Sequence, residues 1–204
     1  MSANLLSSVC VDVYHPMYMR LLGSMLARCS QKKDTLLLYG SVGVGKSELA
    51  RGYIQDSLRD PDLIVSSPTF TIEQQYEHPA LYPIHHIDLY RLSPKDQIPV
   101  DLCDGINLIE WPENLGNKDS LFPSRLEITL TVKTEGDFET SEDIGEFDSA
   151  GHHNATLSPI GDEWNHRIHI LEPYLQEIHR TIKYSEKSVQ RLQGLLPMIN
   201  RNKE

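Results

Sequence analysis

The segment Gly40–Ser47, with the sequence GSVGVGKS, constrains the fold of this chain more than any other feature. It matches the pattern G-x-x-x-x-G-K-[ST], follows an apolar run that predicts a strand (Leu36–Tyr39), and opens a helical pattern at Glu48. Glycines allow backbone N–H groups to surround phosphate oxygens, and the helix N-terminus adds partial positive charge. The segment therefore predicts a nucleotide site. The residues that we expect to bind the nucleotide are Gly40, Val42, Gly43, Val44, Gly45, Lys46, Ser47 and Glu48.

Within this loop, Lys46 is expected to reach the β- and γ-phosphates, and the Ser47 hydroxyl to ligate Mg²⁺. A phosphate-bound Mg²⁺ also needs an acidic side chain at the end of a neighbouring strand. Glu110 ends the apolar run INLIE, as in a Walker B strand, and Asp88 ends the run HHID. One carboxylate should bind the metal and the other should position water or the metal. The residues alone leave open which does which.

Two weaker features lie near these carboxylates. The segment Ser67–Thr71, SPTFT, follows the second predicted strand, where many phosphate-loop enzymes carry the loop that senses the γ-phosphate. Ser-Pro-Thr is also ordinary turn chemistry, so the motif is weak by itself. His85 and His86 precede Asp88 without the further ligands that a zinc site needs, and we interpret them as structural.

The order of apolar runs predicts an α/β fold, a P-loop NTPase with a largely parallel central sheet flanked by helices. We expect one nucleotide-binding domain over residues 1–204, with helices at 16–29 and 48–60. The predicted strands are residues 35–39, 63–66, 81–90, 106–111, 125–132 and 167–173. Residues 174–199 place apolar side chains at three- and four-residue steps and predict a C-terminal helix.

The net charge of −10 comes almost entirely from one segment. Residues 134–163 hold nine acidic side chains and no Lys or Arg, so the rest of the chain is nearly neutral. We interpret this segment as a mobile insertion at the tip of a hairpin formed by residues 125–132 and 167–173. A nearly neutral body lacks the clustered cations that bind bare nucleic acid, so any contact with RNA should be indirect.

Composition limits the cellular setting. No apolar run reaches the roughly 18 residues of a membrane span, and the start MSANLLSSVC lacks the features of a secretory signal. The three cysteines form no CxxC pair, which favours a reducing compartment. We expect a cytoplasmic protein with no membrane partner, or an organellar one in mitochondrion or plastid if the source is eukaryotic.

The motifs GSVGVGKS, SPTFT, HHIDLYRL and IEWPE occur in the order found in the TsaE (YjeE) family of small P-loop ATPases, which this chain resembles over residues 16–133 and 167–173. The resemblance implies a role in making threonylcarbamoyladenosine (t6A) at position 37 of tRNA, with ATP and Mg²⁺ as cofactors. It implies TsaD-like and TsaB-like partners, and an ATPase that is slow alone and stimulated by them.

Carried over by position, the resemblance makes Ser47 and Glu110 the Mg²⁺ ligands, with Asp88 supporting hydrolysis. Thr69 would belong to the switch loop, and Trp111 would lie near the nucleotide. The chain departs from the compact bacterial pattern in its acidic segment and long C-terminal helix. It also has Ser47 where threonine is more usual, which keeps the hydroxyl ligand.

Three alternatives stay open at this point. A regulatory GTPase would need an N-K-x-D loop, and residues 116–120 offer only a near miss. A small nucleoside or metabolite kinase could clamp phosphates with Arg51, Arg59, Arg91 and Arg125, although no arginine-rich lid is evident. A module that binds ATP without hydrolysing it, as part of a complex, is the third.

Overall fold

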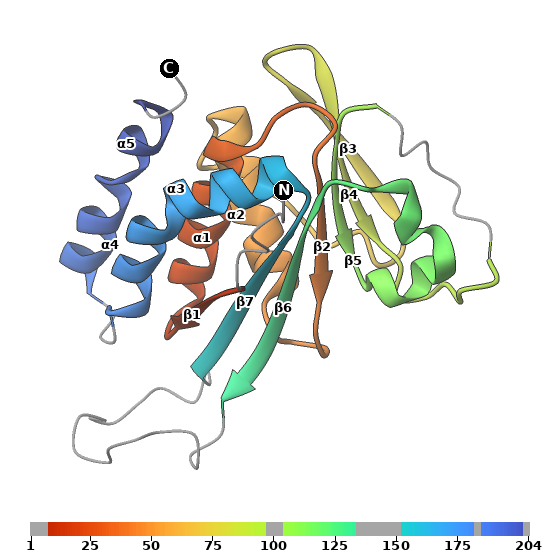
Figure 1. Cartoon of the computed structure of the whole chain (residues 1–204), viewed down its shortest axis with the longest axis horizontal. Helices are drawn as coiled ribbons and strands as arrows, with labels where there is room; N and C mark the ends of the chain where they lie inside the picture. Colours follow the sequence, from red (N-terminus) through yellow and green to blue (C-terminus); the bar gives the residue numbers. More distant parts are fainter. Residues whose placement is uncertain (1–7, 97–103, 134–151, 182–184, 202–204) are drawn as a thin grey trace, which may run out of the picture.

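A seven-stranded mixed sheet, with most of the helices on one face, organises the chain (Figure 1). The computed structural model describes residues 8–96, 104–133, 152–181 and 185–201. The strands are β1 (Val9–Val13), β2 (Thr35–Tyr39), β3 (Glu73–His78), β4 (Tyr82–Asp88), β5 (Ile106–Glu110), β6 (Arg125–Lys133) and β7 (His152–Ile160). The helices are α1 (Pro16–Cys29), α2 (Lys46–Leu58), the 3₁₀ helix η1 (Pro112–Leu121), α3 (Asp162–His179), α4 (Glu186–Gln193) and α5 (Leu196–Arg201).

The sheet has a parallel centre and antiparallel edges. Its strand order is β1-β7-β6-β2-β5-β4-β3, in which β6, β2, β5 and β4 are mutually parallel. Strands β7 and β1 add antiparallel neighbours at one edge, and β3 adds one at the other. This confirms the predicted fold class, and it brings the carboxyl ends of β2, β5 and β4 to one edge, where ligands bind in open α/β sheets.

The two faces of the sheet differ in what covers them. Leu36, Leu38 and Leu108 face a large core that α1, α2 and α3 complete. Leu37 and Ile109 alternate to the other face, where a smaller core includes Leu115 of η1. The alternation follows from the two-residue period of a strand, and both cores are needed because these strands are buried on both faces.

Helices α1 and α2 pack closely because each contributes a glycine at the contact. A Cβ atom on Gly23 would lie 2.1 Å from the Leu49 carbonyl oxygen, and one on Gly52 would lie 2.1 Å from the Arg20 carbonyl oxygen. Any larger residue would push the helices apart. The close packing against α1 thereby fixes the position of α2, whose first turn follows the phosphate loop.

The predicted helix at 16–29 and the strands at 35–39 and 125–132 are confirmed, and the predicted strand at 106–111 is confirmed as β5, which ends one residue earlier at Glu110. The predicted helix from Glu48 begins at Lys46, and the strand region 81–90 contains β4. The predicted strand at 63–66 is wrong. There the Leu63 and Val65 carbonyl oxygens accept hydrogen bonds from the Gln55 and Arg51 side chains of α2, at 3.0 and 2.9 Å, instead of from a neighbouring strand.

The interpretation of residues 134–163 as one inserted segment is wrong at its carboxyl end. Residues 152–160 form β7, which pairs with β6 and β1 inside the sheet, so Leu157 lies opposite both Ile128 and Val9. The strand has few large apolar residues and carries Asn154 and Pro159, which hides it in the sequence. Residues 134–151, which hold most of the acidic side chains, lie outside the described residues, and the proposed mobility of that part stays a prediction.

The predicted strand at 167–173 is also wrong, because these residues lie within α3. Trp164, Ile168, Leu171 and Leu175 are buried at the three- and four-residue steps of a helix, and Asp162 and Glu163 favour its N-terminus. The helix accommodates Pro173, the residue at which the predicted strand ended. The hairpin partner of β6 is therefore β7.

The single C-terminal helix predicted for 174–199 is divided in the structure. Helix α3 ends at His179, and two shorter helices, α4 and α5, follow. Ser185 caps α4 by accepting a hydrogen bond from the Ser188 N–H at 3.0 Å. Among the described residues, no helix combines the length and apolar character needed to cross a membrane.

A buried ion pair joins α3 to the beginning of β2. The Arg167 guanidinium donates to both Asp34 carboxylate oxygens and also to the Cys29 carbonyl oxygen, and its carbon lies 4.1 Å from the centre of the Trp164 ring. Both charged side chains are buried, so neither can exchange its partner for water. Removing Arg167 would leave the buried Asp34 carboxylate without its cation.

We expect Arg167→Met to lower the free energy of unfolding by about 3–5 kcal/mol, because it strands the Asp34 carboxylate in the interior. Arg180→Met is the matched control, since Arg180 makes an exposed ion pair with Glu177 and should change stability by less than about 1 kcal/mol. Urea denaturation measures both. Equal losses in the two variants would contradict a structural role for the buried pair.

Candidate nucleotide-binding site

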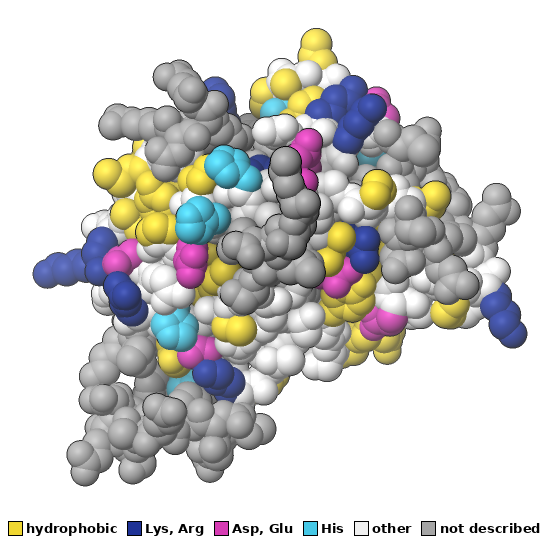
Figure 2. All heavy atoms as spheres, in the orientation of Figure 1, with side chains coloured by type: hydrophobic (Ala, Val, Ile, Leu, Met, Phe, Trp, Pro, Cys, Tyr) yellow, Lys and Arg dark blue, Asp and Glu magenta, His cyan; other side chains and the backbone are white. Residues whose placement is uncertain are grey.

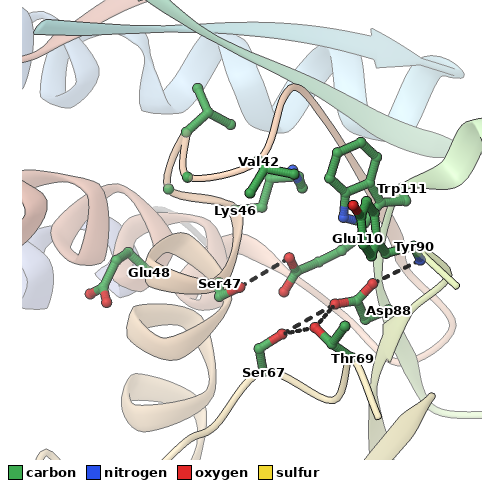
Figure 3. A pocket seen from close by; sticks show the side chains of 13 residues that line it. Val42, Lys46, Ser47, Glu48, Ser67, Thr69, Asp88, Tyr90, Glu110 and Trp111 are labelled. Carbon is green, nitrogen blue, oxygen red and sulfur yellow. Dashed lines mark hydrogen bonds between the residues drawn. The ribbon is translucent and has the colours of Figure 1, made fainter. Parts of the chain in front are cut away.

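A pocket of about 350 Å³ lies at the carboxyl ends of β2, β4 and β5, in front of α2 (Figure 3). The residues that line it are Val42, Gly43, Val44, Gly45, Lys46, Ser47, Glu48, Ser67, Thr69, Asp88, Tyr90, Glu110 and Trp111. Nearly all the residues that the sequence predicted for the site thus lie together. Gly40 does not line the pocket; it follows β2 directly and begins the loop that leads to α2.

The glycines of the phosphate loop adopt backbone conformations that other residues rarely reach. Gly40 has φ of 136° and Gly45, the N-cap of α2, has φ of 102°. A Cβ atom on Gly40 would also lie 2.4 Å from the Leu130 carbonyl oxygen of β6. The loop can therefore turn tightly from β2 into α2, so that the positive end of the helix faces the pocket.

Lys46 is the cation of the loop, and the surrounding groups hold it in place. Its Nζ donates to the Gly40 and Ser41 carbonyl oxygens at 2.7 and 2.8 Å. The same nitrogen lies 3.8 Å from the centre of the Trp111 ring. Burial lowers the pKa of Lys46, while the nearby Glu110 carboxylate opposes that shift. The amine is thus tethered at the loop where phosphate oxygens would bind.

Glu110 lies against the first turn of α2 and has two hydrogen-bond donors. Ser47 Oγ donates to Glu110 Oε2 at 3.0 Å, and His86 Nε2 lies 2.9 Å from Glu110 Oε1. The predicted metal ligands Ser47 and Glu110 are therefore in direct contact. The sequence interpretation treated His86 as structural and did not connect it with the site. Its signal was the alternation His86-x-Asp88, which puts both side chains on one face of β4.

Asp88 connects β4 to the SPTFT segment. Its Oδ2 accepts hydrogen bonds from Thr69 Oγ1 at 2.5 Å and from Ser67 Oγ at 3.1 Å, and its Oδ1 accepts one from the Tyr90 N–H at 2.9 Å. The structure thus brings predicted Thr69 and Asp88 together. Ser67 and Tyr90 were not singled out in the sequence, although both belong to motifs that were.

Trp111 follows Glu110 with a φ of 59°, an uncommon conformation for a bulky residue. Its N–H donates to the Leu38 carbonyl oxygen at 3.3 Å, which extends the β2–β5 pairing by one residue. The ring then turns over Lys46 and lies 4.8 Å from the Tyr90 ring, centre to centre. The Trp111 ring therefore lies beside the phosphate loop, and its expected place near the nucleotide stays a prediction.

The Glu48 side chain, in contrast, points away from the other site residues (Figure 3). It forms ion pairs with Arg20 of α1 and Arg51 of α2. Burial raises the pKa of Glu48, but the hydrogen bonds from these arginines outweigh it, and the net pKa lies below its usual value. Glu48 can therefore contribute to the nucleotide site through its backbone, at the helix N-terminus, while its carboxylate joins α1 to α2.

The donor set of the pocket fits Mg²⁺. This ion takes oxygen ligands and is usually held by one or two carboxylates together with substrate phosphates. Ser47 and Glu110 offer a hydroxyl and a carboxylate in contact, with Asp88 at the neighbouring register position on β4. Among the described residues, no group of three or more His, Cys, Asp or Glu could hold a metal ion without such phosphates.

Comparison with known proteins agrees with this geometry. The family model described as "Threonylcarbamoyl adenosine biosynthesis protein TsaE" matches residues 14–142. A protein of Streptomyces coelicolor named "tRNA threonylcarbamoyladenosine biosynthesis protein TsaE" is 31% identical over 156 residues, which cover 72% of this chain and 93% of that protein. A Nostoc protein of the same name is 31% identical over 125 residues, covering 56% and 73%.

The fold has a counterpart among solved structures. The crystal structure of YdiB from Bacillus subtilis superposes with a TM-score of 0.59 at 17% sequence identity, covering 84% of this chain and 99% of that one. At this identity the likeness concerns the fold alone. The sequence match extends over more than half of the chain and includes the phosphate loop, Asp88 and Glu110. The chain is a P-loop nucleotide-binding protein that belongs to the TsaE family.

Proposed function

We propose that this chain is the Mg²⁺-dependent, ATP-binding and ATP-hydrolysing component of the machinery that makes t6A at position 37 of tRNA. The observation that carries the proposal is the contact between Ser47 Oγ and Glu110 Oε2 beside the buried Lys46. A hydroxyl, a carboxylate and a lysine in this relation are the parts that P-loop enzymes use to hold a metal–nucleoside triphosphate. The family membership connects that chemistry with t6A synthesis.

In this mechanism the chain binds and orients ATP. The N-terminus of α2 and Lys46 bind the phosphates, and Ser47 and Glu110 would hold Mg²⁺. The ion, when bound, supplies positive charge against the charge that develops on phosphoryl transfer. Asp88 supports hydrolysis by holding the Ser67 and Thr69 hydroxyls, and with them the switch segment, at the pocket.

The surroundings of the pocket support partner-stimulated turnover. Three large apolar side chains near the pocket are exposed: Val42 in the phosphate loop, Phe70 in the switch segment and Tyr90 after β4. Phe70 is 86% exposed and lies under the Arg91 guanidinium, 5.2 Å from the ring centre. TsaD-like and TsaB-like proteins that cover these side chains would exclude water from the pocket. The chain alone should therefore turn over slowly.

Contact with tRNA is proposed to be indirect, through those partners. On the face drawn in Figure 2, Lys and Arg side chains are scattered over several elements instead of forming one patch. Several described arginines, such as Arg28 and Arg125, are paired with carboxylates. Tight binding to a phosphate backbone needs clustered free cations. We propose the cytoplasm as the compartment, or an organelle if the source is eukaryotic.

The kinase alternative finds no support among the described residues. None of Arg51, Arg59, Arg91 and Arg125 lines the pocket. Arg51 is paired with Glu48, and Arg125 with Glu127. The non-hydrolysing module differs from the proposed enzyme only in turnover, so measuring product separates the two.

Reconstitution tests the proposed function. The purified chain is combined with TsaD-like and TsaB-like proteins, unmodified tRNA, ATP and a threonylcarbamoyl donor, and t6A is measured together with released phosphate. We expect repeated rounds of modification and faster phosphate release when all components are present. Modification that proceeds equally well without the chain, or phosphate release that is independent of the partners, would contradict the proposal.

We expect Lys46→Ala to weaken ATP binding by at least about a hundredfold, because it removes the cation nearest the phosphates and its charge-assisted hydrogen bonds. Calorimetric titration measures the affinity. Lys32→Ala is the control, since Lys32 lies at the opposite end of the parallel strands in an exposed pair with Asp104. Equal affinities in wild type and Lys46→Ala, with unchanged circular dichroism, would contradict the nucleotide site.

Glu110→Gln should reduce ATP hydrolysis at least about tenfold more than it reduces ATP affinity, because it keeps the shape of the side chain but removes the charge that faces the metal. Steady-state phosphate release and calorimetry separate the two effects. Glu113→Gln provides the comparison, since Glu113 is an exposed acid three residues further on that does not line the pocket. Similar losses in both variants would argue against a specific role for Glu110.

A further inference from the structure

His86 is a fully buried polar side chain on the face of the sheet that carries the large core. It is 0% exposed and occupies the face of β4 that α1 and α2 cover, with Ile84 two residues before it and Asp88 two residues after. Its register partner on β5 is Leu108, which is also fully buried. A leucine would fit such a position, whereas a buried imidazole loses its contacts with water.

The imidazole is bonded on one side only. His86 Nε2 lies 2.9 Å from Glu110 Oε1, and an ionised carboxylate can only accept, so Nε2 carries the hydrogen and donates it. In the neutral tautomer this leaves a bare Nδ1, which is buried and has no hydrogen-bond partner among the described residues. A buried acceptor without a partner costs free energy. The hydrogen bond to Glu110 offsets part of the free-energy cost of burying the imidazole.

That contact determines how the Glu110 carboxylate is turned. Its two oxygens are held separately, Oε1 by His86 and Oε2 by Ser47. The positive charge of Lys46 acts on the same carboxylate. Without the donor on Oε1, the Glu110 side chain could rotate toward Lys46 and form an ion pair with the amine, which would then compete with phosphate binding. Lys46 is instead bonded to the Gly40 and Ser41 carbonyl oxygens.

We propose that His86 is a positioning residue, which fixes Glu110 so that Oε2 faces Ser47 and the metal while Lys46 stays available to the nucleotide. It contacts the metal ligand, not the metal or the nucleotide. Partners of this kind orient ligands, and their loss typically weakens metal affinity or activity about 10- to 100-fold. The inference deepens the proposed function and rests on it for the identity of the metal.

The test compares two amides at this position. The Gln amide nitrogen reaches about as far as imidazole Nε2, and the shorter Asn amide does not. We measure the affinity of a non-hydrolysable ATP analogue by calorimetry, with Mg²⁺ and with EDTA. The quantity compared is the ratio of the analogue's affinity with Mg²⁺ to its affinity with EDTA. In His86→Asn this ratio should be about tenfold smaller than in the wild type, while the affinity in EDTA stays within about twofold of the wild-type value. His86→Gln should recover most of the wild-type ratio.

His85 provides the matched control on the same strand. It lies on the opposite face, with Nδ1 2.5 Å from Glu73 Oε1 and Nε2 3.0 Å from the Asp104 carbonyl oxygen. His85→Asn should keep the wild-type response to Mg²⁺. In turnover, His86→Asn should lower kcat and raise the Mg²⁺ concentration that gives the half-maximal rate.

Nitrogen NMR of the imidazole adds a readout that needs no ligand. We expect His86 to be the Nε2–H tautomer, with a proton that exchanges slowly and that exchanges faster in Glu110→Ala. An Nδ1–H tautomer, or an Mg²⁺ response that is the same in the Asn and Gln variants, would overturn the inference. A wild-type protein that binds nucleotide without any response to Mg²⁺ would instead contradict the proposed function.

Discussion

The parallel pairing of β2, β5 and β4 is the constraint on which the site depends. In this register Leu38 pairs with Glu110, and Glu110 pairs with Asp88, so both carboxylates lie level with the last residues of the strand that leads into the phosphate loop. The Ser47–Glu110 contact then needs only one turn of α2 to follow the loop. A slip of one residue in either pairing would move a carboxylate to the opposite face of the sheet. The same pairing that forms the core therefore aligns the groups that we propose act on the nucleotide.

The site concentrates buried ionisable groups, and each is stable there because another group faces it. Lys46, Asp88 and Glu110 are all at most 5% exposed. Such burial is costly for a charge unless partners are close. Lys46 has two carbonyl oxygens and the Trp111 ring, Asp88 has two hydroxyls and an N–H, and Glu110 has Ser47 and His86. Each group is thus held by its partners within the fold, so the entropic cost of ordering these side chains is met on folding.

The parts of this arrangement that the sequence predicted are those with strong local signals. The phosphate loop has its glycines, β2 and β5 are continuous apolar runs, and Asp88 and Glu110 end their strands. The parts that it did not predict depend on tertiary contacts. Strand β7 is polar along much of its length and is stabilised by pairing with β6 and β1 on both sides. Helix α3 keeps Pro173 because its other side buries Trp164, Leu171 and Leu175. The alternation His86-x-Asp88 puts His86 on the same face as Asp88, but no local pattern pairs it with Glu110, which lies on another strand.

The carboxyl-terminal part of the chain bears on the site although it lies outside the stretch that matches the family model. That match ends at residue 142, whereas β7 and α3 begin later. Even so, β7 lies inside the sheet between β1 and β6, and Arg167 of α3 binds Asp34, the residue just before β2. Strand β2 is therefore held at its beginning by α3 and leads at its end into the phosphate loop. The two parts of the chain differ in what they require: β7 and α3 need a suitable pairing edge and an apolar face, which many sequences supply, whereas the loop needs its glycines, Lys46 and a hydroxyl at fixed positions.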